Sequence, residues 1–217
     1  NKNVEVATRL DAAEELKKIG TSEAIFCLLQ RFTVVIGGPT PDENEKNTVW
    51  QIVQDAGQTA VEPLMRFIRE KETVGQALEI LGIIPRDTNY LDLLLELATS
   101  FDPYYSKYPD KKIQVFRKMA AFKDLRIIDT LEKFLDDDDD DIRMAALAAV
   151  NAQDDEDKVR ELLIQTILGS SERPRLRMAA CEYMAEKRWS VRGYRKQIET
   201  VLPDKFYLNK QGEILTR

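Results

Sequence analysis

The sequence repeats one short motif, IRMAA at Ile142–Ala146 and LRMAA at Leu176–Ala180, at a separation of 34 positions. The match continues beyond the motif, because Leu147 corresponds to Cys181. In each copy the apolar residues recur three and four positions apart, which is the spacing of one face of an α-helix. A helical pattern that recurs at such a period indicates a repeat protein.

The same template extends over the chain, each unit being a first helix, a turn and a second helix. Its turn positions, where glycine is the expected residue after a helix, fall at Gly20, Gly57, Gly82, Lys123, Asp154 and Arg188. No charged residue stands eight, seven or four positions before any of these turns, although 32% of the chain is charged. One helical hairpin cannot bury its apolar stripe alone, so stacked neighbours share a core. The sequence therefore predicts an all-α stack of about six antiparallel helical hairpins.

We expect a single domain over residues 1–202, followed by a capping tail at 203–217. The predicted units cover residues 4–36, 43–71, 73–100, 110–136, 138–169 and 172–202. Two loops rich in proline or glycine interrupt them, at 37–41 and at 102–109. The tail could cover the last hairpin, form a short β-hairpin around Gln211 and Gly212, or dock on a partner. Asn1 stands where an initiating methionine would, which indicates a fragment or a processed chain.

The residues resemble the HEAT-repeat family, in particular the bacterial HEAT-like units of the phycobilisome-lyase type. Arg9–Gly20 looks like a first helix of such a unit, and Gly57–Leu64 looks like a turn and a second helix. Asp141-Ile142-Arg143 is similar to the aspartate-x-arginine that opens many of these units. The resemblance implies a right-handed superhelix of helix pairs, an α-solenoid, and it implies no particular reaction.

Composition argues against catalysis. Histidine is absent, which excludes histidine triads, histidine-ligated metals and imidazole bases. No Gly-x-Ser-x-Gly, glycine-rich phosphate loop or Cys-x-x-Cys occurs. We therefore expect no enzyme activity, no cofactor and no metal, with a bilin-lyase-like or other HEAT-like enzyme as the alternative.

Six consecutive aspartates, Asp136–Asp141, are the most conspicuous charge run. Calcium loops alternate their ligands around a glycine and end in a glutamate, and this run does neither. The other interpretation is an acidic turn that caps the following helix, where aspartate accepts backbone N–H groups. The spacing favours the cap over a cation site.

Basic residues gather later in the chain, with eight basic and three acidic residues between Glu172 and Lys196. They either form structural pairs, as we expect above all for Arg177 and for Arg143 at the equivalent position of the preceding repeat, or make a patch for an acidic partner or nucleic acid. A net charge of −6 disfavours nucleic-acid binding. As candidate contact residues in this run we take Arg188, Arg192, Arg195 and Lys196.

A second candidate contact site is the loop that carries Tyr104, Tyr105 and Tyr108. Exposed aromatic residues are enriched in binding hot spots. The alternative is that the rings fold back over the short third unit. Sequence alone leaves the two interpretations open.

The leading hypothesis is a non-catalytic scaffold or adaptor that binds a partner protein through its concave or loop surface. Cys27 and Cys181 both fall in apolar helical patterns, so we expect buried free thiols and a reducing, cytoplasmic location. No apolar run approaches the length of a membrane span. The oligomeric state cannot be inferred from these patterns.

Overall fold

A computed structural model describes residues 5–36, 39–84, 90–170 and 173–217 of the chain. The chain divides into two compact parts, which are larger than the predicted repeat units and are described separately. We call them unit 1 (Asn1–Leu93) and unit 2 (Leu94–Arg217). Apart from one short β-hairpin, the described elements are helices, and the predicted all-α class is confirmed. Within these residues no helix is long and apolar enough to cross a membrane.

Unit 1 is built from consecutive helices joined by short links. They are α1 (Val6–Ile19), α2 (Ser22–Leu29), the short 3₁₀ helix η1 (Gln30–Thr33), α3 (Pro39–Asp55), η2 (Gly57–Ala60), α4 (Val61–Glu70) and α5 (Gly75–Ile83). The next helix, α6 (Tyr90–Ser100), contains the boundary between the units.

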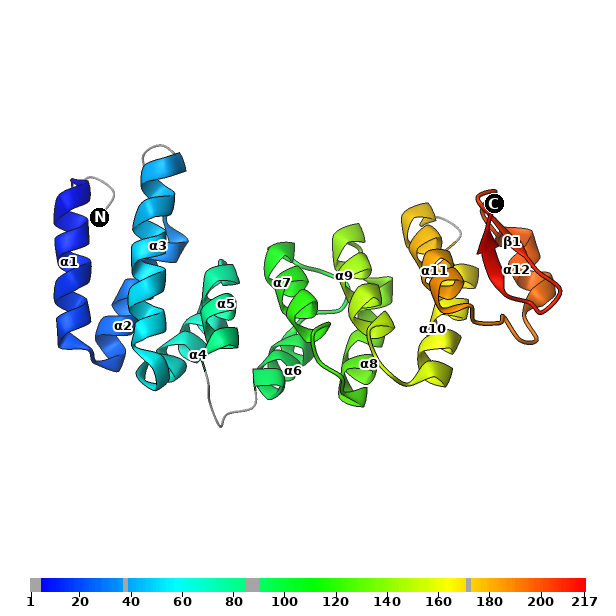
Figure 1. The fold of residues 1–217 in the computed structure, drawn as a ribbon, viewed down its shortest axis with the longest axis horizontal. Coiled ribbons are helices and arrows are strands. Elements are labelled where there is room, and N and C mark those ends of the chain that lie inside the picture. The colour runs from blue at the N-terminus through cyan, green and yellow to red at the C-terminus, as the bar shows by residue number, and fades with distance from the viewer. Residues whose placement is uncertain (1–4, 37–38, 85–89, 171–172) are drawn as a thin grey trace. The chain divides into compact units, whose positions relative to one another are not determined.

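The helices of unit 1 lie in two layers (Figure 1). The first helices form one layer, in which α1 contacts α3 and α3 contacts α5. The second helices form the other, in which α2 contacts α4. Between the layers the side chains of Leu29, Val53 and Leu64 are fully buried. Each such burial contributes about 1.5–3 kcal/mol, so the shared core holds the hairpins together.

The turn positions are only partly as predicted. Gly20 ends α1 with φ 62°, and Arg188 ends α11 (Pro174–Lys187) in the same left-handed region with φ 51°. The turn predicted at Gly82 is wrong, because α5 continues through it to Ile83. A Cβ on Gly82 would lie 3.5 Å from the ring of Tyr90, an ordinary van der Waals contact, so the position does not require glycine.

The loop predicted at 37–41 is shorter than expected. Gly37 and Gly38 lie outside the described residues, and Pro39–Pro41 form the first turn of α3. Proline is tolerated there because the first N–H groups of a helix have no intrahelical acceptor.

Unit 2 continues the alternation of first and second helices. Its elements after α6 are α7 (Pro109–Met119), α8 (Leu125–Leu131), η3 (Glu132–Asp136), α9 (Asp140–Asn151), α10 (Glu156–Gly169), α11, α12 (Arg195–Val201), β1 (Phe206–Leu208) and β2 (Ile214–Thr216). Along this unit α7 contacts α9, and α9 contacts α11.

Small residues allow the first helices of unit 2 to approach closely. Ala146 of α9 and Ala180 of α11 are fully buried at the repeated motif. In the same unit the rings of Phe116, on α7, and Phe134, on η3, pack with centroids 4.8 Å apart. The motif that suggested the repeat thus forms the packed interior of this unit.

The tail forms a β-hairpin against the last helices. β1 and β2 pair antiparallel, with Phe206 opposite Thr216 and Leu208 opposite Ile214. Phe206 and Ile214 are buried, and the strands contact α12 and α11 respectively. Gly212, with φ 80°, sits in the turn and accepts a hydrogen bond on its carbonyl from the N–H of Val191, at 2.8 Å.

Candidate partner-binding surface

The tyrosine loop links α6 to α7 in unit 2 and presents its rings to solvent. Tyr104, Tyr105 and Tyr108 are 63%, 66% and 49% exposed. The rings therefore do not fold back into a core, which was the alternative that the sequence left open. Rings that are this exposed leave apolar surface in contact with water, and a bound partner could bury that surface.

Asp102 shapes the backbone of this loop. Its Oδ1 accepts hydrogen bonds from the N–H of Tyr104 at 2.8 Å and of Tyr105 at 3.2 Å. These bonds, the one from Tyr104 first, lower the pKa of the Asp102 carboxyl. An ionised aspartate in this arrangement fixes a turn, so the backbone that carries the two adjacent rings is held in a defined conformation.

Lys112, one turn into α7, ties the loop to the body of unit 2. Its Nζ donates to the carbonyl oxygens of Asp102 at 2.5 Å and Tyr105 at 3.2 Å. It also donates to Oδ2 of Asp137 at 2.8 Å, and both side chains are almost fully buried. An ammonium group has three protons to donate, and all three have acceptors here. The loop is thus an ordered surface and not a loose connection.

The aspartate run is structural, as the cap interpretation predicted. Asp139 is the N-cap of α9 and accepts from the N–H groups of Asp141 and Ile142. Asp136 pairs with Arg173 at 2.8 Å, and Asp141 pairs with Arg175 at 2.6 Å. Across the described part of the chain, no three acidic or cysteine side chains are placed to hold a metal ion.

The two arginines at the repeated position, Arg143 and Arg177, make hydrogen bonds within the fold. Arg143 donates to the carboxylate of Asp140 and to the carbonyl of Asp137. Arg177 donates to the carbonyl oxygens of Ile167 at 3.2 Å and Val201 at 3.4 Å. Those carbonyls lie near the ends of α10 and α12, where the last carbonyls have no intrahelical donor. The structural interpretation therefore accounts for this column of the repeat.

The four candidate basic residues are exposed: Arg188 is the C-cap of α11, Arg192 lies between α11 and α12, and Arg195 and Lys196 begin α12. Arg195 pairs with Glu199 at 2.9 Å and donates to the carbonyl of Asn209. Arg188, Arg192 and Lys196 make no ion pair with any residue that the structure describes. Within unit 2 they lie at the α12 end, whereas the tyrosine loop precedes α7, at the other end (Figure 1). The structure thus separates the two sets of candidate residues.

The sequence did not single out Lys112 and Asp137, which hold the tyrosine loop. It was also wrong about one cysteine. Cys181 is buried, and burial raises the pKa of its thiol to about 12. Cys27 is exposed, because it lies off the buried stripe of α2, which Ala24, Ile25, Leu28 and Leu29 form. Helical spacing alone could have placed it there.

Comparison of the chain with protein-family models, curated proteins and solved structures found no match.

Proposed function

We propose that this chain is a non-catalytic module that binds a partner protein, and that the tyrosine loop of unit 2 is its contact surface. The proposal includes a HEAT-like architecture, in which the successive helix pairs continue as a right-handed solenoid. Its support is the layered contact of first helices with first helices inside each unit.

The observation that carries the binding proposal is a set of exposed rings on a rigid support. Three tyrosines are about half exposed or more, while Lys112 and Asp137 beneath them are buried and paired. Binding costs less when the contact surface is already ordered. Tyrosine also gives a large contact area with few rotatable bonds and a hydroxyl for polar contacts. These properties suit recognition of a folded protein surface or an extended peptide.

The binding test compares three proteins, each spanning residues 1–217. They are the native chain, the triple variant Tyr104→Ser, Tyr105→Ser, Tyr108→Ser, and the control Tyr207→Ser. Tyr207 is 41% exposed on β1, so its replacement removes a similar ring from another part of unit 2. Each protein is immobilised, proteins are captured from the source cells, and the dissociation constant of any purified partner is then measured.

We expect a protein that the native chain and the Tyr207→Ser control retain and the triple variant loses. Its affinity for the triple variant should fall at least about 30-fold, the effect of a hot spot worth roughly 2 kcal/mol. Equal binding to native chain and triple variant would contradict the proposal, and so would the absence of any specific partner.

Small-angle X-ray scattering tests the architecture. A compact globule of this length has a radius of gyration of about 17 Å. A stack of six hairpins is longer than it is wide, so its radius of gyration should be clearly larger. A value near that of the globule would exclude the solenoid.

A further inference from the structure

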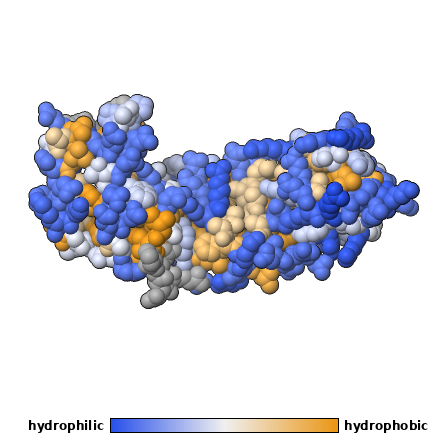
Figure 2. Space-filling model, viewed as in Figure 1, coloured by the Kyte–Doolittle hydropathy of each residue, from blue (hydrophilic) through white to orange (hydrophobic). Residues whose placement is uncertain are grey.

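A cavity of about 450 Å³ lies in unit 1, between α1, the α2–η1 segment and α3. Its apolar walls include the side chains of Leu10, Ala13, Leu16, Leu28, Ile36 and Val49. Figure 2 shows hydrophobic side chains between α1 and α3, with hydrophilic side chains of these helices around them. The volume falls in the range of about 300–1,000 Å³ that small-molecule sites occupy.

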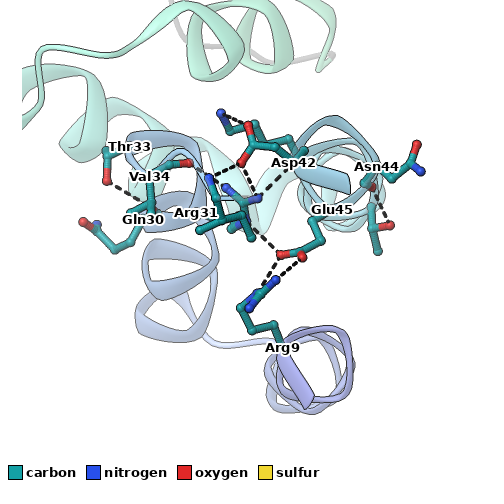
Figure 3. A network of polar contacts seen from close by, with 11 residues as sticks. Arg9, Gln30, Arg31, Thr33, Val34, Asp42, Asn44 and Glu45 are labelled. Atoms are coloured by element: carbon teal, nitrogen blue, oxygen red, sulfur yellow. Dashed lines mark hydrogen bonds and ion pairs between the residues drawn. The ribbon is translucent and has the colours of Figure 1, made fainter. Parts of the chain in front are cut away.

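Charged residues converge on one wall of this cavity (Figure 3). Glu45, on α3, lies between two arginines from different elements. Arg9 of α1 donates Nη2 to Oε1 at 2.6 Å and Nε to Oε2 at 3.0 Å. Arg31 of η1 donates Nε to Oε2 at 3.1 Å. The side chains of Arg9, Arg31 and Glu45 are only 15%, 13% and 3% exposed.

A second layer of bonds fixes Arg31. Its Nη2 lies 2.7 Å from Oδ1 of Asp42, and its Nη1 donates to the carbonyl of Val34. Asp42 also accepts from Lys46 and from the N–H of Ile36. Three cations, Arg9, Arg31 and Lys46, thus surround two carboxylates, and Arg9, Arg31 and Glu45 line the cavity. Counted over these described side chains, the cluster carries one positive charge in excess.

We propose that the cavity binds a small amphiphile with an aliphatic body and a carboxylate end. The leucine, isoleucine and valine walls would cover the aliphatic body, and each buried CH₂ would contribute about 0.8 kcal/mol. The carboxylate would lie against the positive wall, where electrostatic complementarity distinguishes an anionic from a cationic end group. This site is separate from the tyrosine loop, since all its residues belong to unit 1.

Cys27 supplies a built-in probe, because it is exposed and lines the cavity. Iodoacetamide is added to the whole chain of residues 1–217 with octanoate, octanol or octylammonium, each below its micelle concentration, and alkylation is followed by mass spectrometry. Cys181 is buried and reports any unfolding by the amphiphile.

Octanoate should slow alkylation of Cys27 at least about five-fold, octanol should slow it less, and octylammonium should have the smallest effect. Equal protection by all three would overturn the proposed preference for an anion. No protection by octanoate would overturn the site itself.

A matched pair of variants locates the ligand. Ala12→Phe places a ring at the mouth of the cavity, which Ala12 lines as an exposed residue of α1. Ala7→Phe adds the same ring to an exposed position of α1 that does not line it. Isothermal titration with octanoate should detect binding to the native chain and to Ala7→Phe but not to Ala12→Phe. Unchanged binding to Ala12→Phe would place the ligand elsewhere and overturn the proposal.

Discussion

Lys112 and Asp137 form a buried ion pair, with Nζ 2.8 Å from Oδ2 and side chains only 3% and 1% exposed. The pair joins the first turn of α7 to the turn before α9. Because Lys112 also bonds the carbonyls of Asp102 and Tyr105, the conformation of the tyrosine loop depends on it. The pair is therefore a structural support of the surface that we propose for binding.

Replacing Lys112 by Met should destabilise unit 2 by about 3–5 kcal/mol, because the carboxylate of Asp137 would remain buried without its partner. The double variant Lys112→Met, Asp137→Leu should recover much of that loss, since no buried charge remains. Urea denaturation followed by the fluorescence of Trp189, in a Trp50→Phe background, measures the free energy of unfolding of the single and the double variant. Lys107→Met, at an exposed lysine of the same loop, should change stability by less than about 0.5 kcal/mol.

Lys112→Met should also make the tyrosine loop less ordered. In Lys112→Met the amide protons of Tyr104 and Tyr105 should exchange with solvent faster than in the native chain, because their turn loses its anchor. Unchanged exchange would mean that Asp102 alone orders the loop.

Asp139 and its neighbour Asp138 allow the stabilising effect of a helix cap to be distinguished from that of a surface charge. Asp139 caps α9, whereas Asp138 is exposed and no bond of its side chain is seen among the described residues. Asp139→Ala should cost about 1 kcal/mol of unfolding free energy, and Asp138→Ala less than about 0.5 kcal/mol. Both changes remove one negative charge from the same run, so a similar loss in the two variants would show that net charge and not capping is measured.

Arg188 occupies a backbone conformation that favours glycine, with φ 51° at the C-cap of α11. Left-handed φ costs a side-chain-bearing residue roughly 1 kcal/mol, part of which glycine loses again as chain entropy. Arg188→Gly should therefore stabilise unit 2 by about 0.5 kcal/mol in thermal or urea denaturation. Arg192→Gly, which removes the same charge from a residue without positive φ, should give no gain.

Arg188 shows how well the repeat alignment predicts the ends of the helices. The alignment placed Arg188 in the column of turn glycines, and the structure gives it the left-handed φ of Gly20. The same alignment failed at Gly82, because α5 continues one residue beyond it, to Ile83. Apolar spacing fixes which face of a helix is buried, whereas it does not fix the residue at which a short helix ends.

The sites were less predictable than the helices. The tyrosine loop could be found because prolines and tyrosines break the helical pattern. Its support could not, because Lys112 and Asp137 are 25 positions apart and Asp137 is one of six identical neighbours. Only the turn before α9 decides which aspartate points inward. Glu45 likewise looks like an ordinary helical carboxylate until α1 and η1 bring Arg9 and Arg31 to it.

The Glu45 cluster also makes unit 1 sensitive to acid. Hydrogen bonds from Arg9, and then from Arg31, lower the pKa of Glu45 below its ordinary 4.5 despite burial. For Asp42 burial acts in the opposite direction, but bonds from Lys46, Arg31 and the Ile36 N–H outweigh it and lower its pKa below 3.8. Both carboxyl groups therefore bind protons more readily in the unfolded chain.

Because of this difference, protonation favours the unfolded state. The stabilisation is complete above about pH 5, and is lost as the pH falls toward the lowered pKa values. Urea denaturation between neutral and acid pH, followed by Trp50 fluorescence in a Trp189→Phe background, should show this decline. Glu45→Gln should be less stable at neutral pH, and its stability should depend less on pH. Glu43→Gln, at an exposed carboxylate of the same helix, should follow the native curve. If Glu45→Gln also followed it, Glu45 would not be a source of the acid sensitivity.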